Sequence, residues 1–329
     1  MHTLKRLILL FLIIVSLFIG WFIYYINVAS YSPSTPYEFS IKPGSNLKDI
    51  AEQLNATGIL SNAWSFILLS RVMGYESSLK AGDYEITEAI PPLQLLKRIT
   101  DGTSSQSEIK FIEGWTFRQL RQSLDAHPAI RHDTKELNDK EILRMIGANE
   151  TIAEGLFFPD TYFFSKNSSD IGILKRAYRG MQSNLISAWK KKDQDLFLKN
   201  AYQALILASI VEKETGKEED RATIAGVFIN RLRLGMPLQT DPTVIYGLGE
   251  KFNGNLRKID LLTDHTYNTY TRLGLPPTPI SMPGMSSILA TLNPAKTDAL
   301  YFVAKGNGKS HFSNNLVDHN RAVAKYQKR

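Results

Sequence analysis

The stretch that decides the fold is Leu205–Gly216, which reads Leu-Ile-Leu-Ala-Ser-Ile-Val-Glu-Lys-Glu-Thr-Gly. Its apolar residues recur with the period of an α-helix, and both of its sides are apolar or small, which predicts a buried helix. On a helical wheel, Glu214 shares the face of Ile210. Glu212 points almost the opposite way, beside Ser209. The two carboxylates therefore meet different surroundings.

Both glutamates stand where a carboxylate is disfavoured. Gly216 can end the helix, so Glu212 and Glu214 fall in its last turn, where the negative end of the helix dipole costs a carboxylate about 0.3–1 kcal/mol. An apolar face and a negative helix end both favour the protonated acid, as a general acid near neutral pH requires. The alternative is a pair of solvated glutamates that form ion pairs with Lys213 or Lys217.

Composition sets the outer limits. With 329 residues, of which 43% are hydrophobic and 22% charged, the chain can bury a sizeable core and is expected to form two folded domains. The six histidines show no metal-ligand spacing and cysteine is absent, so we expect no metal and no cofactor. The net charge of +7 comes without an Arg/Lys-rich helix or nucleic-acid motif, which argues against a nucleic-acid partner.

The N-terminal segment predicts a membrane anchor. Lys5 and Arg6 precede residues 7–26, which carry no charge and would span about 30 Å as a helix. Aromatic residues lie near the far end, and the positive residues before the span are expected to stay in the cytoplasm. A cleaved signal peptide is the alternative, although its apolar core would normally be about 7–15 residues long.

A small βααβ module is expected after a linker rich in Ser, Pro and Tyr. Alternating apolar residues predict strands at Tyr37–Ile41 and Gly82–Thr87, and the helical period predicts a helix capped by Asn46, a second at Asn62–Met73 and a closing helix before Gly102. The stretch Ile-Lys-Pro-Gly-Ser-Asn-Leu-Lys-Asp-Ile-Ala that starts at Ile41 resembles the opening of LysM domains, which bind N-acetylglucosamine polymers. A generic α+β spacer domain is the alternative.

A turn-and-helix pattern recurs 70 residues later. Gly114 and Thr116 stand where Gly44 and Asn46 stood, each pair followed by the same apolar helical spacing. We therefore predict a strand-turn-helix unit in each domain and place the boundary in the Ser/Thr-rich run Thr103–Ser107.

The second domain is expected to be a larger mixed α/β domain. Helical patterns cover residues 139–146, 171–189 and 221–232, and a hairpin is expected at residues 300–312. The aromatic-rich run 154–164 could line a sugar site or form a core strand. Loops dense in Pro, Asn and Tyr favour polar ligand contacts. The candidate substrate-binding residues are Glu212, Gln239, Thr240, Asp241, Tyr246, Tyr267, Asn268 and Tyr270.

Several motifs together carry a resemblance to a known family. In chain order they are Glu113-Gly-Trp, Glu154-Gly-Leu-Phe-Phe-Pro-Asp-Thr-Tyr, Ala208-Ser-Ile-Val-Glu-Lys-Glu-Thr, Val227-Phe-Ile-Asn-Arg-Leu, Leu238-Gln-Thr-Asp-Pro-Thr-Val-Ile-Tyr-Gly, Tyr267-Asn-Thr-Tyr and Leu300-Tyr-Phe-Val-Ala. This set resembles the endolytic murein transglycosylases, also called YceG-like proteins, over nearly the whole chain.

The resemblance implies a bacterial inner-membrane protein that faces the periplasm and cuts peptidoglycan strands internally, limiting the length of nascent strands, with peptidoglycan synthases as possible partners. It also implies that the catalytic glutamate is the second of the Glu-x-Glu pair, Glu214. As an acid and then a base, Glu214 would leave 1,6-anhydro-N-acetylmuramic acid ends. Asp241 and Asp160 remain candidates for a supporting carboxylate. A lysozyme-like hydrolase and a non-catalytic glycan-binding scaffold stay open as alternatives.

The expected fold class is α+β, with an N-terminal transmembrane helix, a LysM-like module and a catalytic domain. The expected boundaries are a cytoplasmic tail at 1–6, the anchor at 7–26, a linker at 27–36, the module at 37–106 and the catalytic domain at 107–329.

Overall fold

The computed structural model describes residues 2–28, 37–41, 44–76, 78–86, 89–101 and 106–327. Contacts within the chain divide it into two compact units, of which the first is Met1–Ser107 with Phe163–Asn167 and the second is Glu108–Tyr162 with Ser168–Arg329. Most of the expected linker 27–36, most of the boundary run Thr103–Ser107, the turn residue Pro43 and the expected strand end Thr87 lie outside the described residues.

Helix α1 (His2–Asn27) contains the apolar run, and its segment Leu4–Asn27 is long and apolar enough to cross a membrane. Most of its described side chains are exposed, but those near its C-terminal end pack on the first unit. The Tyr25 side chain is buried, and its hydroxyl donates to the backbone oxygen of Asn62 at 3.0 Å. Phe22 and Ile26 pack against the core of the same unit. The end of α1 is therefore part of that core.

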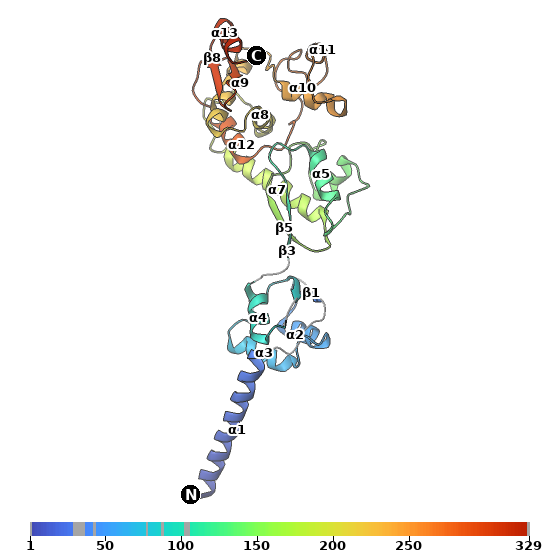
Figure 1. Ribbon diagram of the computed structural model, residues 1–329, viewed down its shortest axis with the longest axis vertical. Helices are drawn as coiled ribbons and strands as arrows, with labels where there is room; N and C mark the ends of the chain where they lie inside the picture. Colours follow the sequence, from blue (N-terminus) through green and yellow to red (C-terminus); the bar gives the residue numbers. More distant parts are fainter. Residues whose placement is uncertain are drawn as a thin grey trace. The chain divides into compact units, whose positions relative to one another are not determined.

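The first unit has the expected βααβ order followed by a closing helix (Figure 1). Strands β1 and β2 pair antiparallel, with Tyr37 opposite Ile86. Asn46 caps the following helix by accepting from the Asp49 amide at 2.9 Å, as its position in the sequence predicts. The elements are β1 (Tyr37–Ile41), α2 (Leu47–Ala56), α3 (Ala63–Val72), β2 (Gly82–Ile86) and α4 (Pro92–Asp101).

The second unit is largely helical, with short strands. Strand β3 (Gln106–Lys110) pairs with strand β5 (Thr161–Ser165). The division between the two units runs through both strands. The other elements are α5 (Phe117–Asp125), β4 (Ile130–Arg131), α6 (Asp139–Ile146), β6 (Ser168–Ser169), α7 (Asp170–Trp189), α8 (Ala201–Glu214), α9 (Glu218–Arg233), α10 (Asp241–Leu248), the 3₁₀ turn Gly249–Lys251, α11 (Lys258–Leu262), α12 (Met285–Leu292), β7 (Tyr301–Ala304), β8 (Ser310–Ser313) and α13 (Leu316–Tyr326).

The sequence repeat corresponds to a structural repeat. Gly44 and Gly114 both adopt the left-handed backbone, with φ of 85° and 77°, where a side chain would be strained. Each precedes a capped helix, and Thr116 and Gln119 form a reciprocal capping box at the start of α5. The late hairpin is confirmed as well, since β7 and β8 pair antiparallel.

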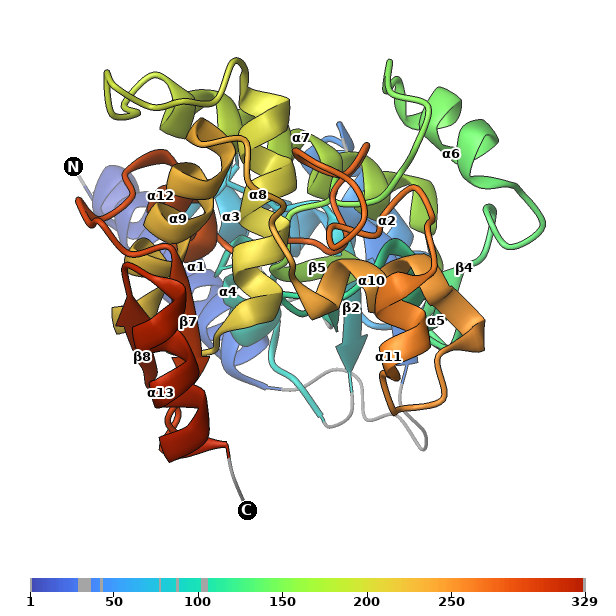
Figure 2. The same cartoon turned by 90° about the horizontal axis from the view of Figure 1, so that it is seen from above.

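Helix α8 is the centre of the second unit. Every residue from Ala204 to Val211 is buried, as the apolar periodicity predicts. The helix packs against α7, α9, α10 and α12 (Figure 2). It ends at Glu214, because Thr215 is already extended, so the chain leaves the helix before the expected stop at Gly216. This dense packing holds the two glutamates of the last turn in place.

Candidate active site

The two glutamates at the end of α8 contact different segments, as the helical wheel predicts. The Oε1 atom of Glu214 accepts a short hydrogen bond from the Thr240 hydroxyl. The Oε2 atom of Glu212 accepts from the Gly284 amide at 3.0 Å. The segment before α10 thus reaches one glutamate and the segment before α12 reaches the other.

Glu214 lines a cavity of about 500 Å³ in the second unit. Its walls come from α8, α9, the loop before α10, the β7–β8 hairpin and α13, which meet in space although they are distant in sequence. The polar lining residues are Glu214, Arg231, Gln239, Asp241, Tyr270, Tyr301, Ser310, His319, Asn320 and Gln327. A cavity rich in hydroxyl, amide and charged groups suits a polar ligand.

The surroundings of Glu214 raise the pKa of its carboxyl into the neutral range. Burial raises its pKa from the ordinary value to about 7, and the negative charge of Asp241 adds to the rise. The hydrogen bond from Thr240 and the positive charge of Arg231 act in the opposite direction but are outweighed. A carboxyl with this pKa can donate a proton and take one back at neutral pH, which is what a general acid–base group must do.

Thr240 is itself held by a network of buried threonines. Its amide donates to the Thr269 hydroxyl at 3.1 Å, and its carbonyl accepts from the Thr243 hydroxyl at 2.7 Å. The hydroxyls of Thr243 and Thr269 lie 2.8 Å apart. All three threonines are buried. The network therefore fixes the direction from which Thr240 meets Glu214.

Arg231 is a buried cation that ties two walls of the cavity together. Its Nε donates to the Leu300 carbonyl at 2.7 Å, and its Nη1 donates to the Leu238 carbonyl at 2.9 Å. Its guanidinium carbon lies 5.0 Å from the centre of the Tyr301 ring. Sequence reasoning missed this residue, although an arginine inside the apolar run Val227-Phe-Ile-Asn-Arg-Leu was a usable signal, because a buried cation needs such partners.

Gln239, Asp241 and Tyr270, three of the residues predicted to bind substrate, all line the cavity. The Tyr270 hydroxyl donates to Oδ1 of Asp241 at 2.5 Å. Gln239 is exposed and adopts an unusual positive φ of 50°, which turns the chain just before Thr240. Asp241 is the carboxylate of the cavity other than Glu214, and Asp160 is not among its lining residues.

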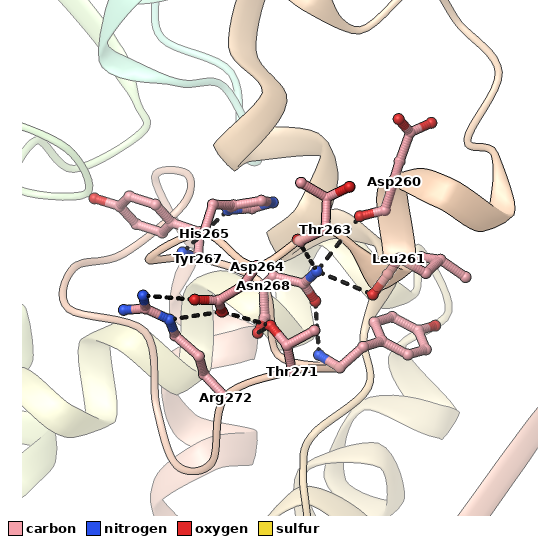
Figure 3. Close-up of polar contacts among 10 residues, drawn as sticks. Asp260, Leu261, Thr263, Asp264, His265, Tyr267, Asn268, Thr271 and Arg272 are labelled. Carbon is pink, nitrogen blue, oxygen red and sulfur yellow. Dashed lines mark hydrogen bonds and ion pairs between the residues drawn. The ribbon is translucent and has the colours of Figure 1, made fainter.

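Asn268 is close to Tyr270 in the chain and has no exposed surface. Its amide nitrogen donates to the carbonyls of Leu261 and Thr263 at 3.0 and 2.7 Å, and its Oδ1 accepts from the Tyr270 amide at 2.9 Å (Figure 3). Asp264 and Arg272 close the same loop with an ion pair of 2.9 Å. Through these hydrogen bonds, Asn268 holds the loop that carries Tyr270.

Tyr246 and Tyr267 contact each other edge to face, with ring centres 4.8 Å apart and an interplanar angle of 67°. Neither is among the residues that line the Glu214 cavity. Tyr246 instead hydrogen-bonds Glu154, in a second cavity of about 440 Å³. Burial raises the pKa of Glu154 to about 7. Glu154 also accepts from the Phe117 amide at 3.0 Å, so it satisfies the N-terminus of α5.

Glu212 sits in a polar cluster on the other side of α8. Its Oε1 lies 3.8 Å from Nη2 of Arg221, and only 7% of its side chain is exposed. Burial and the charge of Glu212 raise the pKa of the neighbouring Glu113. The alternative of a solvated Glu212 paired with a lysine is wrong, because in the described part of the chain Lys213 instead donates to the Gly114 carbonyl at 3.3 Å. Glu212 therefore stabilises the start of α12 through its hydrogen bond from the Gly284 amide.

Metal ligands are not gathered anywhere in the described ranges: they contain no group of three or more His, Asp or Glu side chains that could hold a metal ion.

Comparisons with known proteins identify the family of this chain. The profile of the YceG-like family matches residues 39–325. An endolytic murein transglycosylase of Bacillus subtilis is 32% identical over 309 residues, covering 89% of this chain and 85% of that protein. One from Streptococcus pneumoniae is 30% identical over 324 residues, covering 87% of this chain and 57% of that protein.

The fold is also similar to a solved structure. A crystal structure of a yceG-like protein from Listeria monocytogenes matches with a TM-score of 0.56 and 30% identity, covering 88% of this chain and 99% of that one. With a family profile over most of its length and relatives at this identity, the chain belongs to the YceG-like family.

Proposed function

We propose that this protein is an endolytic peptidoglycan lyase that cleaves the β-1,4 bond between N-acetylmuramic acid and N-acetylglucosamine inside glycan strands. Relatives at 30–32% identity are named endolytic murein transglycosylases, which supports the substrate class. The observation that carries the proposal is Glu214, a carboxyl with a pKa of about 7 that lines a polar cavity and is oriented by the Thr240 hydroxyl.

The reaction uses one carboxyl twice. Protonated Glu214 donates its proton to the glycosidic oxygen, and the bond from that oxygen to the muramic anomeric carbon breaks. The substrate's acetamido oxygen stabilises the positive charge that develops at this carbon. Glu214, now a carboxylate, takes the proton of the muramic C6 hydroxyl, whose oxygen bonds to the anomeric carbon. The product is a 1,6-anhydro end, and Glu214 regains its proton without any water being added.

The environment of Glu214 suits both halves of this cycle. Burial favours the protonated carboxyl in the free enzyme, while Thr240 and Arg231 stabilise the carboxylate that exists between the two proton transfers. Asp241, engaged by Tyr270 at 2.5 Å, is the supporting carboxylate that we place in the cavity. Its negative charge can help stabilise the developing positive charge on the sugar.

The products separate this function from its alternatives. Purified protein is incubated with peptidoglycan that carries no stem-peptide cross-links, and the released fragments are measured by mass spectrometry. We expect internal fragments with 1,6-anhydro ends, which are lighter by one water than hydrolysis products. Reducing ends would show a lysozyme-like hydrolase with a water nucleophile, and intact strands would show a glycan-binding scaffold.

We further propose that α1 is retained as a single membrane anchor, which places the rest of the first unit and the whole second unit on the periplasmic side of the inner membrane. Cleavage after a signal sequence would remove Tyr25 and Phe22 from the core that they help to form, and would leave buried apolar surface exposed. A cytoplasm-active reporter fused after the last residue should be silent. An active reporter, or a mature N-terminus beyond Tyr25, would contradict this topology.

The first unit is proposed to bind glycan, in keeping with its LysM-like opening. It has a groove of about 710 Å³ lined by Trp64, Asn46 and Arg71, and 58% of the Trp64 surface is exposed. An exposed indole can pack on the apolar face of a sugar ring. In protein that carries Glu214→Gln and so cannot cut, Trp64→Ala should weaken the binding of glycan strands. Unchanged binding would favour the alternative that the unit is a spacer domain.

A further inference from the structure

One face of the C-terminal helix α13 lines the cavity of Glu214, although nothing in the sequence marked this helix as part of a site. Leu316, His319, Asn320, Val323 and Gln327 all line that cavity. Their spacing places them along one stripe of the helix. The stripe alternates apolar side chains with groups that can donate and accept hydrogen bonds.

The stripe is anchored to the wall that holds Arg231. The His319 ring stacks on the Tyr301 ring with centres 5.1 Å apart and an interplanar angle of 27°. The same Tyr301 ring lies under the Arg231 guanidinium at 5.0 Å. Arg231 in turn donates to the Leu238 carbonyl, two residues before Thr240. A continuous set of contacts therefore fixes α13 relative to the loop that touches Glu214.

Polar groups on this stripe are left for a ligand. The Asn320 residue is exposed and lines the cavity, and no hydrogen bond of its side chain is present within the described residues. His319 stands next to Asn320 on this stripe and also lines the cavity. Burial and the charges of Arg231 and His311 lower the pKa of His319, which favours the neutral ring. A neutral imidazole has one donor and one acceptor.

We propose that α13 is a glycan-binding wall of the active site, with Asn320 and His319 hydrogen-bonding an N-acetylhexosamine next to the bond that is cut, while Leu316 and Val323 contact the sugar ring. This inference rests on the proposed function and adds the binding surface. An N-acetylhexosamine offers an amide, hydroxyls and an apolar ring face, which match the alternation on the stripe. Internal cutting also requires sugars to be held on both sides of the bond.

Asn320→Ala tests the proposal, because this side chain is exposed and its loss should leave folding intact. The full chain in detergent carries Glu214→Gln so that it cannot cut, and its affinity for defined uncross-linked glycan strands is measured with and without Asn320→Ala. Arg321→Ala is the matched control, since Arg321 is the next residue, 77% of its side chain is exposed, and it lines a different cavity.

Loss of one or two hydrogen bonds from Asn320 should weaken binding about 3–10-fold, whereas Arg321→Ala should change it by less than about 2-fold. In the otherwise unchanged enzyme, Asn320→Ala should raise KM by a similar factor with little change in kcat. Equal affinity and KM for the Asn320→Ala and parent proteins would overturn the role of α13, and so would an equal effect of Arg321→Ala.

The same experiment keeps this proposal apart from the proposed function. If the parent enzyme cuts no strand and the Glu214→Gln protein binds none, the proposed function fails and α13 loses its ligand. If the parent cuts strands but Asn320→Ala changes neither affinity nor KM, only the glycan-binding wall is wrong. If Glu214→Gln binding is too weak to measure, the KM values of the active proteins decide.

Discussion

Glu212 and Glu214 are the same residue type, two positions apart in the last turn of one helix, yet their surroundings differ in kind. Glu214 meets a hydroxyl and lines a cavity, and burial raises its pKa to about 7. Glu212 meets a backbone amide at 3.0 Å and the Arg221 guanidinium at 3.8 Å. A carboxyl whose burial outweighs its stabilising partners becomes an acid near neutral pH, whereas one held by an amide and a nearby guanidinium becomes a structural link.

The largest effect is expected from Glu214→Gln. Glutamine keeps the size of the side chain and accepts from Thr240, but it cannot donate a proton and recover it. We expect strand cleavage to fall by about 10²–10⁴-fold or more, with folding and glycan binding retained. Release of anhydro ends measures the rate, and circular dichroism checks the fold. A folded Glu214→Gln protein with near-parent activity would show that another group is the acid.

Glu212→Gln should affect stability more than catalysis. It removes the charge opposite the buried Arg221, although Glu113 remains close to that arginine and limits the loss. We expect a loss of about 1–3 kcal/mol in the free energy of unfolding and less than about a 10-fold loss of activity. Denaturant unfolding and strand cleavage of the same preparation test this. A stable but inactive Glu212→Gln protein would reverse the comparison.

The smallest expected effect is a pH-dependent gain in thermal stability of Glu214→Gln. The pKa of Glu214 is about 7 when folded, above its ordinary value, so the stability that its protonated form contributes at low pH is lost as pH rises through about 7. Glutamine does not ionise. The Tm of Glu214→Gln should therefore exceed that of the parent by a few degrees at about pH 8 and by much less at about pH 5.

The comparison of the parent with the Glu214→Gln protein contains its own control. Glu154 also has a pKa of about 7, but it is present in both proteins and its contribution cancels in the difference. An equal Tm difference at both pH values would show that ionisation of Glu214 does not destabilise the folded protein.

Periodic and local features were predictable from the sequence. The burial of α8, the opposite directions of its glutamates, the Asn46 cap and the late hairpin follow from apolar spacing and turn residues, which are local properties. The gathering of Gln239, Thr240, Asp241 and Tyr270 around Glu214 agrees with the motifs in which they stand.

What the sequence did not reveal depends on contacts between distant segments. Arg231 and His319 reach the cavity through Tyr301, from three elements that are far apart in the chain. Tyr246 stands in the same motif as Thr240 but turns to Glu154, because it lies six residues further on, inside α10, where the helix points it to another side. Asn268 reads as a polar ligand contact in sequence, yet in the structure it is buried and binds loop carbonyls.

The pH dependence of kcat/KM for strand cleavage tests most directly whether Glu214 works as a protonated acid. The pKa of about 7 predicts that kcat/KM is high near pH 6 and falls above pH 7, as Glu214 loses its proton. The residual activity of Glu214→Gln should lack this fall. A rate that rises through pH 7, or a fall that persists unchanged in Glu214→Gln, would contradict the account.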